Sequence, residues 1–256
     1  MPNLGENVAV GDTKPLENSL KLAFSAAHDF HRINEMLAPD IGDSSHPNRF
    51  LADRLSTAFA RAVAGGSAAF MEDATGELKA VTVAYHLNAA EDPDLHTHTE
   101  LGSTSSAMPG YSIANLVVAA LALREWLHNP PAEMIAAKIR PENIPSLKVY
   151  KEALGWAPIE DRALHAQLTD ASRQTMADPS NPLNGREWYA LKDVVIKKQA
   201  ETVLGFMEQG GLVNKQTGDF IPVDFSALEK EGLTRARLEA LAAGVTTRNK
   251  LPKPTP

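Results

Sequence analysis

The pattern of apolar and polar residues changes its period along this chain. In residues 16–37 apolar side chains recur at helical spacing, and Asn48 can cap a second helix that Gly65 and Gly66 end. The next segments are short and rich in Val, Thr and Tyr, or they alternate strictly, which predicts strands. These strands cover residues 67–72, 78–87 and 95–103, and a turn at residues 73–76 joins the first two.

A helix, a strand and a second helix follow. Residues 103–110 are small and turn-prone, and an amphipathic helix begins near Ser112. Residues 134–140 are predicted to form a strand, and residues 145–154 a helix that Gly155 ends. The remaining elements, in chain order, are a strand over residues 187–192, a helix over residues 193–207, a hairpin framed by Gly210-Gly211 and residues 214–218, and one or two helices within residues 226–243.

The connections between these elements predict the fold class. Short turns join the first three strands, so they are expected to be antiparallel, whereas residues 95–140 are expected to form a right-handed parallel crossover. This order predicts an α/β fold: a mixed, mostly antiparallel sheet with a central parallel strand pair and flanking helices. We expect a loose arm over residues 1–15, one domain over residues 16–193, and a helical and hairpin extension over residues 194–256 that ends in a Pro-rich tail.

Composition removes several classes of protein from consideration. The chain has 256 residues, no cysteine, and a formal net charge of −7 from 25 Lys plus Arg and 32 Asp plus Glu. Without cysteine there is no disulfide scaffold, iron–sulfur cluster, cysteine nucleophile or thioester on the protein. The negative charge argues against broad nucleic-acid binding. The most apolar run, residues 113–123, is too short to span a membrane, and the first residues show no secretory signal, so we expect a cytoplasmic protein.

Two stretches resemble the GNAT superfamily of N-acetyltransferases. PGYSIANLVVAAL, residues 109–121, is similar to the family's acyl-CoA pyrophosphate loop, Arg/Gln-x-x-Gly-x-Gly/Ala, with Pro109 at the basic or amide position, Ser112 at the central Gly and Ala114 at the last small position. IRPENIPSLKVYKEALGW, residues 139–156, is similar to a second hallmark, a strand followed by Asn and by a helix ending in Tyr-x-x-x-Gly-aromatic. Its matching residues are Asn143, Ser146, Tyr150, Gly155 and Trp156. The resemblance covers about residues 16–193 and implies a GNAT-like acyltransferase domain there.

The resemblance also implies that acetyl-CoA is the co-substrate, and it assigns residues to that ligand. Those residues are Gly110, Tyr111, Ser112, Ile113, Ala114, Asn115, Asn143, Ser146 and Tyr150. The chemistry of the loop agrees, because a helix N-terminus behind small residues presents free N–H groups and a partial positive charge to a pyrophosphate. The alternatives are that residues 110–112 only cap a buried helix, that Asn143 caps the next helix, and that Tyr150 is a core aromatic.

Direct acetyl transfer to an amine needs a base, donors for the thioester carbonyl and an acid for the departing thiolate. Glu100 and His98, on the strand before the loop, are the candidate bases, although a solvated strand face is an alternative for Glu100; Tyr150 is the candidate acid. Because no cysteine offers a covalent relay, we expect transfer within a ternary complex. The acceptor stays open among a small amine, an aminoglycoside-like molecule, a protein N-terminus and a lysine.

Two other functions remain as alternatives. Pro109 and Ser112 depart from the pyrophosphate motif, which leaves a catalytically inactive GNAT-like module whose extension after residue 193 binds a partner. His96 and His98 share a strand face with Glu100, which leaves a metal-dependent enzyme, although we expect no metal. The expected partners are an acyl-CoA and an amine acceptor, and a homodimer is an open alternative to a monomer.

Overall fold

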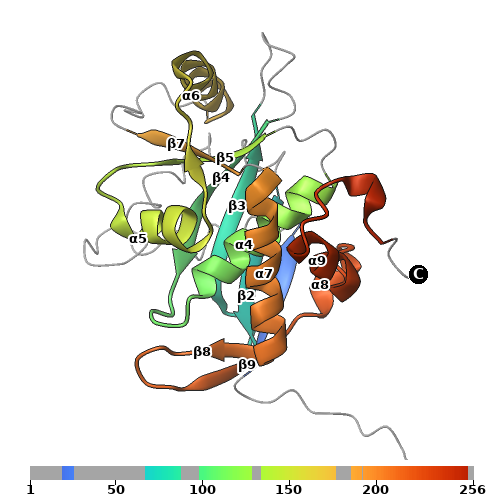
Figure 1. The fold of residues 1–256 in the computed structure, drawn as a ribbon. Coiled ribbons are helices and arrows are strands. Elements are labelled where there is room, and N and C mark those ends of the chain that lie inside the picture. Colours follow the sequence, from blue (N-terminus) through green and yellow to red (C-terminus); the bar gives the residue numbers. More distant parts are fainter. Residues whose placement is uncertain are drawn as a thin grey trace, which may run out of the picture.

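One mixed sheet organises the part of the chain that the structure describes. The computed structural model describes residues 19–25, 67–87, 98–128, 134–176, 186–191 and 193–252. Within them nine strands lie in the order β6-β7-β5-β4-β3-β2-β1-β9-β8 (Figure 1). Their bounds are β1 Leu20–Ser25, β2 Ser67–Asp73, β3 Leu78–His86, β4 His98–Ser106, β5 Met134–Ile139, β6 Ala157–Pro158, β7 Glu187–Leu191, β8 Gly211–Val213 and β9 Phe220–Asp224. The predicted arm at residues 1–15, the helix after Asn48 and His96 lie outside the described residues.

Strand directions confirm the predicted fold class. The strands from β1 to β4 pair antiparallel in chain order, β4 and β5 are parallel, and β5, β7 and β6 are antiparallel again. The helix α4 (Ile113–His128) makes the crossover between the two parallel strands, as the predicted strand–helix–strand order requires. The chain is therefore a mixed α/β sheet with a central parallel pair and flanking helices.

The first described segment is a strand, and the helix predicted over residues 16–37 is wrong at residues 20–25. β1 pairs antiparallel with β2 along its whole length and parallel with β9. Leu20 and Leu22 are buried on either side of exposed Lys21, so apolar residues that fit a helical stripe also fit one strand face. Pairing with β2 and β9 decides the conformation, because it satisfies the backbone N–H and C=O groups of β1. These partners are distant in sequence, so local periodicity does not reveal them.

β4 continues to Ser106, through part of the small-residue stretch that predicts a turn. Its second half pairs with β3 across a register shift between Val81 and Val83. A small residue is needed there, because a Cβ at Gly102 would lie 3.2 Å from the ring of Tyr85. The small residues thus serve close packing on a strand, and the turn is confined to residues 107–112.

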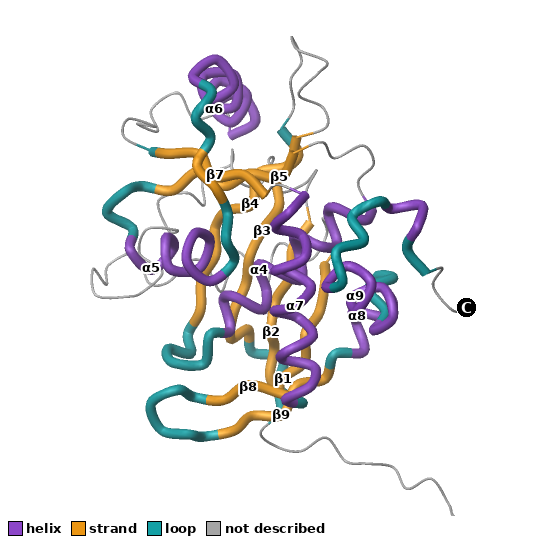
Figure 2. The backbone as a smooth tube through the Cα atoms, viewed as in Figure 1, coloured by secondary structure: helices purple, strands orange, loops and turns teal. Residues whose placement is uncertain are grey.

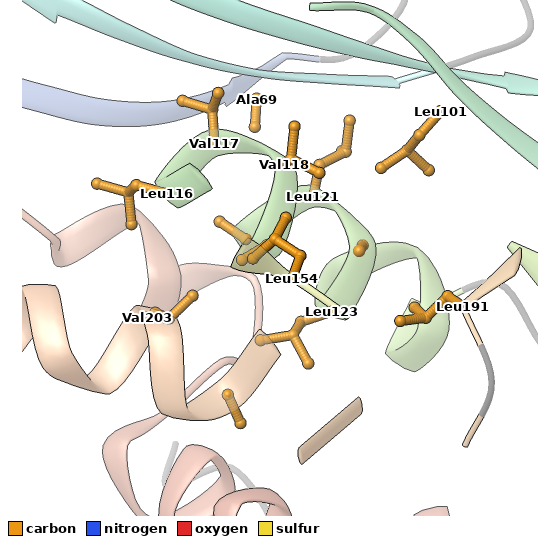
Figure 3. Close-up of a cluster of buried hydrophobic side chains, with 14 of the residues drawn as sticks. Ala69, Leu101, Leu116, Val117, Val118, Leu121, Leu123, Leu154, Leu191 and Val203 are labelled. Atoms are coloured by element: carbon orange, nitrogen blue, oxygen red, sulfur yellow. The ribbon is translucent and has the colours of Figure 1, made fainter. Parts of the chain in front are cut away.

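The helix α4 is the centre of the core. All residues from Leu116 to Leu123 are fully buried. In Figure 3 Val117 and Val118 lie on the side of the sheet near Ala69, and Leu123 lies on the side of α7 (Asp193–Gln209) near Val203. A helix that is apolar on all sides needs cover on all sides. The uninterrupted apolar run therefore forms a middle layer between the sheet and α7.

Residues after 193 cover α4 and extend the sheet. In Figure 1 α7 lies in front of α4, and it contacts both α4 and α9 (Arg235–Ala242). The hairpin of β8 and β9 joins the sheet beside β1 (Figure 2). The short helix α8 (Ser226–Lys230) contacts β1, and a 3-10 turn, η4 (Arg248–Lys250), follows α9. These elements confirm the predicted order of helix, hairpin and two helices, and α7 carries the chain from β7 to the far edge of the sheet. Among the described residues no helix is both long enough and apolar enough to cross a bilayer.

On the other face of the sheet, α6 (Arg162–Met176) packs against β5 and β7. Ala136 packs there with Leu168 and Trp188, whereas its neighbours Ile135 and Ala137 belong to the core beside α4. Successive residues of a strand face opposite sides, so α4 and α6 lie on opposite faces of β5. Between β5 and β6 the chain forms α5 (Ile144–Leu147), which continues as a π-helix, η3 (Lys148–Ala153).

A buried carboxylate joins α4 to the strands beneath it. Glu125 accepts a hydrogen bond from Ser67 Oγ at 2.5 Å, and His86 Nε2 lies 3.0 Å from its other oxygen. Arg124 donates from Nη1 to Glu125 at 3.1 Å and from Nε to Glu231 at 2.6 Å. Burial would raise the pKa of Glu125, but the hydrogen bonds to His86 and Ser67 and the charges of His86 and Arg124 outweigh burial and lower it. Glu125 therefore links three parts of the fold as an ionised group.

Replacing Glu125 by Gln should change how stability depends on pH. A carboxyl whose pKa is lowered in the folded state stabilises the fold above its unfolded value, near 4.5, and loses that contribution as the pH falls through the folded value. We expect Glu125→Gln to cost about 1 to 3 kcal/mol of unfolding free energy near neutral pH. The cost should shrink at acidic pH, which urea denaturation at a series of pH values measures. The exposed Glu239→Gln is the control, and a cost for Glu125→Gln that does not vary with pH would contradict the prediction.

Candidate active site

The two parallel strands at the centre of the sheet separate after three residue pairs. β4 and β5 pair at His98 with Met134, at Thr99 with Ile135 and at Glu100 with Ala136. Beyond these pairs β4 stays with β3 and β5 stays with β7. A gap therefore opens in the middle of the sheet directly after Glu100, with backbone groups along both of its sides.

Glu100 stands at the start of this gap, on the face against which α6 packs. Its side chain is 2% exposed, and Ser172 Oγ of α6 donates to its Oε2 at 2.8 Å. Lys138 Nζ, from β5, lies 3.4 Å from Glu100 Oε1 and donates to Ser172 Oγ. The ammonium of Lys138 also lies 5.8 Å from the centre of the Trp188 ring. The carboxylate predicted as a base is thus buried in an ion pair, and the alternative of a solvated strand face is wrong.

Tyr150 lies on the opposite face, in the core beside α4. Its hydroxyl is 3.0 Å from Thr104 Oγ1, which is 2.8 Å from Thr82 Oγ1. Burial raises the pKa of Tyr150 to about 12; the hydrogen bonds of Thr104 and Thr82 oppose this shift and the charge of Glu100 adds to it. The phenol is therefore a neutral hydrogen-bond donor at physiological pH.

A wide helical turn places Tyr150. Four residues stand between Tyr150 and Gly155, one more than in the Tyr-x-x-x-Gly pattern, so the match of residues 139–156 is not in strict register. The π-helix η3 takes up this extra residue: Leu154 N–H donates to Val149 C=O at 2.9 Å, five residues back. Gly155 then ends the helix at a φ of 75°, and Trp156 meets Tyr150 edge-on with ring centres 5.0 Å apart. Trp156 Nε1 is buried and has no hydrogen-bond partner within the described part of the chain.

The loop before α4 contains two residues in the left-handed region of the backbone. Gly110 and Ser112 have positive φ values of 89° and 54°, and Asn115 N–H donates to Ser112 C=O at 3.0 Å. The N–H groups of Ile113 and Ala114 belong to the first helical turn, where no intrahelical acceptor exists. Gly110 also contacts the β8–β9 hairpin, whose Lys215 N–H donates to its C=O at 3.1 Å.

The remaining predicted residues divide between these regions. Tyr111, Ala114 and Asn115 are half-buried in the loop and at the helix start, and Ile113 is buried. Asn143 Oδ1 accepts from Ser146 N–H at 3.2 Å, which is the helix cap named as an alternative. His98 is buried two residues before Glu100 on the same strand face. The described residues contain no group of three or more His, Asp or Glu side chains arranged for a metal ion.

Lys138 and Ser172 are not identified as site residues from the sequence. Lys138 could have been noticed, because it is the one charged residue in the buried strand MIAAKI. Ser172 could not, since it lies on a helix that the apolar pattern does not predict.

Comparison with known proteins gives similarity in structure alone. No family model matches the chain, and no curated protein matches it. The aminoglycoside acetyltransferase AAC(6')-Ib, in complex with coenzyme A and kanamycin, is 14% identical to this chain, with a TM-score of 0.39 over 70% of this chain and 98% of that one.

Two further solved structures are similar in the same range. A putative acetyltransferase, ACIAD1637 from Acinetobacter baylyi ADP1, is 13% identical, with a TM-score of 0.43 over 69% of this chain and 94% of that one. FdhC, a nucleotide-linked sugar GNAT, is 12% identical, with a TM-score of 0.40 over 74% of this chain and 94% of that one. The GNAT class indicated by the sequence thus recurs among the similar structures, which at these values assign this chain no activity and no site residue.

The high pKa of Tyr150 predicts a titration that one substitution removes. The folded value, about 12, lies above the ordinary 10.0, so the neutral phenol stabilises the fold below about pH 10. This stabilisation is lost as the pH rises from about 10 toward 12. We expect Tyr150→Phe to remove the phenolate absorbance step near pH 12, and Tyr111→Phe, the control, to retain it. If the difference in phenolate absorbance between the wild type and Tyr150→Phe instead titrates near pH 10, burial does not raise the pKa of Tyr150 as stated.

Proposed function

We propose that this protein transfers an acetyl group directly from acetyl-CoA to a primary amine. The observation that supports this most is the gap between β4 and β5, with Glu100 on one face and the Tyr150 hydroxyl on the other. An amine and a thioester that meet in this gap have a carboxylate on one side and a phenol on the other. Direct transfer needs that arrangement, because the proton leaves the nucleophile while charge develops on the leaving group.

The proposed step moves one acyl group and one proton. The amine nitrogen bonds to the carbonyl carbon, the carbon–sulfur bond breaks with its electron pair on sulfur, and Glu100 accepts the proton of the amine. Backbone N–H groups along the gap are donors for the carbonyl oxygen while it is tetrahedral. Glu100 is favoured over His98 as the base, because it lies at the last strand pair and His98 stands about 7 Å back along β4.

We expect Tyr150 to act as a hydrogen-bond donor to the leaving thiolate and not as a general acid. Its pKa of about 12 is well above that of an alkyl thiol, about 8.5, so full proton transfer to the departing thiolate is unfavourable. The phenol instead stabilises the thiolate by donating a hydrogen bond and keeps its proton. Its bond to Thr104 would orient the hydroxyl before the reaction.

The pyrophosphate of acetyl-CoA would bind at the start of α4. Gly110, Tyr111 and Ser112 bring the backbone close, and Ile113, Ala114 and Asn115 begin the helix whose N-terminal charge favours an anion. Asn143 and Ser146, at the start of α5, would line the path of the pantetheine arm. Trp156 Nε1, beside Tyr150, is a further buried donor for that arm.

A binding module without catalysis is the second candidate. It is favoured by Pro109, which supplies neither charge nor amide at the loop, and by the burial of Glu100 against Lys138 and Ser172. This candidate predicts coenzyme A binding with no turnover.

Acetyl-CoA binding and turnover separate the two candidates. Acetyl-CoA at about 100 times its Kd should stabilise the fold by about 2.7 kcal/mol, which a thermal shift detects. Release of free thiol with a panel of primary amines, including polyamines, aminoglycosides and peptide N-termini, would support the enzyme. A shift without thiol release would favour the module, and the absence of a shift at millimolar acetyl-CoA or a longer acyl-CoA would exclude both.

Tyr150→Phe tests the role of the phenol in turnover. Removing one donor to a developing charge costs about 100-fold in kcat, whereas coenzyme A binding should change little because the pyrophosphate contacts lie elsewhere. Steady-state kinetics of thiol release and calorimetric binding of coenzyme A measure the two effects. Tyr189→Phe on β7 is the matched control, and a variant at Tyr150 with wild-type kcat would remove this residue from the mechanism.

A further inference from the structure

We infer that Lys138 and Ser172 are positioning residues that hold the Glu100 carboxylate in place across the gap between β4 and β5. This assignment rests on the proposed function, since it concerns the same site. Neither residue belongs to the motifs of the sequence, and they come from two elements, β5 and α6, that do not hold the candidate coenzyme A loop.

The position of Lys138 makes it a bridge between the separated strands. It stands two residues after Ala136, the last residue of β5 that pairs with β4. At that level β5 pairs with β7, where Lys138 lies opposite Trp188. Its side chain nevertheless returns to Glu100 of β4, at 3.4 Å. A side-chain ion pair therefore connects the two strands just beyond the last backbone pairing.

Each oxygen of Glu100 is fixed by a different partner. Oε1 faces the ammonium of Lys138, and Oε2 accepts from Ser172 Oγ at 2.8 Å. The partners are joined to each other by the hydrogen bond from Lys138 to Ser172. Two contacts from two directions define both the position and the plane of the carboxylate.

Burial gives this arrangement a cost in free energy. The side chains of Glu100 and Lys138 are each 2% exposed, and Ser172 is fully buried. A charge out of water must be paired and hydrogen-bonded, and a buried pair often adds nothing to stability over apolar packing. Its retention at the point where the strands separate fits a requirement of the reaction, namely a carboxylate held at a fixed distance from the attacking amine.

A second polar contact joins α6 to the sheet without involving Glu100, which provides a matched control. Trp188 Nε1 of β7 donates to Thr169 Oγ1 on α6 at 3.0 Å, one turn before Ser172. Thr169→Ala removes a polar contact between α6 and the sheet without touching Glu100. Ser172→Ala removes a contact of the same kind that does touch it.

The test is kinetic and compares single with double variants. In thiol release with the best amine of the panel, Ser172→Ala should lower kcat about tenfold with the KM for acetyl-CoA unchanged, and Thr169→Ala should retain wild-type kcat. Lys138→Met should lower kcat further, and Lys138→Arg should recover part of it because it keeps the charge. In a Glu100→Gln background, Ser172→Ala should have no further effect on kcat, since residues that act through Glu100 lose their influence with it.

Several outcomes would overturn the assignment. They are wild-type kcat in Ser172→Ala, an equal loss in Thr169→Ala, and a tenfold loss from Ser172→Ala that persists in the Glu100→Gln background, which would indicate a general effect on the fold. Thermal unfolding of each variant identifies a loss of folding, and Ser172→Ala, which keeps the ion pair, decides the matter if Lys138→Met does not fold. A wild type that releases no thiol, whether or not it binds acetyl-CoA, refutes the proposed function and this assignment with it. An active wild type with unaffected variants refutes the assignment alone.

Discussion

The separation of β4 from β5 is the constraint on which the other features of the site depend. A sheet tolerates such a gap only if each strand remains paired on its other edge, and here β3 and β7 provide that pairing. The crossover helix α4 lies beneath the gap on one side and α6 lies on the other. Polar side chains with defined partners lie on its two faces: Glu100 with Lys138 of β5 and Ser172 of α6 on one, and Tyr150 of η3 with Thr104 on the other. The opening interrupts the hydrogen bonding of the sheet, and it has a carboxylate on one face and a phenol on the other.

Most of the fold follows from sequence patterns that are local. The strands β2, β3 and β5 and the helix α4 appear where periodicity and turn residues place them, because their own residues supply the apolar faces that they bury. β1 does not, since Leu20 and Leu22 satisfy both a helical and a strand spacing and the choice depends on β2 and β9. The helix α6 packs few apolar residues against the sheet, so the apolar pattern of its sequence does not predict a helix there.

The site was predictable in part for the same reason. Glu100 is the last residue of β4 that pairs with β5, and the Tyr150 hydroxyl lies beside Thr104 farther along β4; these positions follow from the strand–helix order, and the roles of both residues remain proposals. The ion pair of Glu100 could not be predicted, since it joins residues of three elements through tertiary contacts. The register of the second motif also depends on tertiary structure: one additional residue before Gly155 is absorbed by a wide turn, which α7 supports through the hydrogen bond from Gln199 to Leu154 C=O at 2.8 Å.

The pairing of β1 with β9 has a consequence for how the chain is made. The two strands come from near opposite ends of the described residues, so the partner of β1 on one edge is synthesised late. On the ribosome β1 and β2 can pair with each other while the second edge of β1 still exposes unsatisfied backbone groups. An open edge of this kind can pair with another nascent chain before its own partner emerges. The sheet can therefore close only after β9 has emerged, and completion of the central strands is not sufficient.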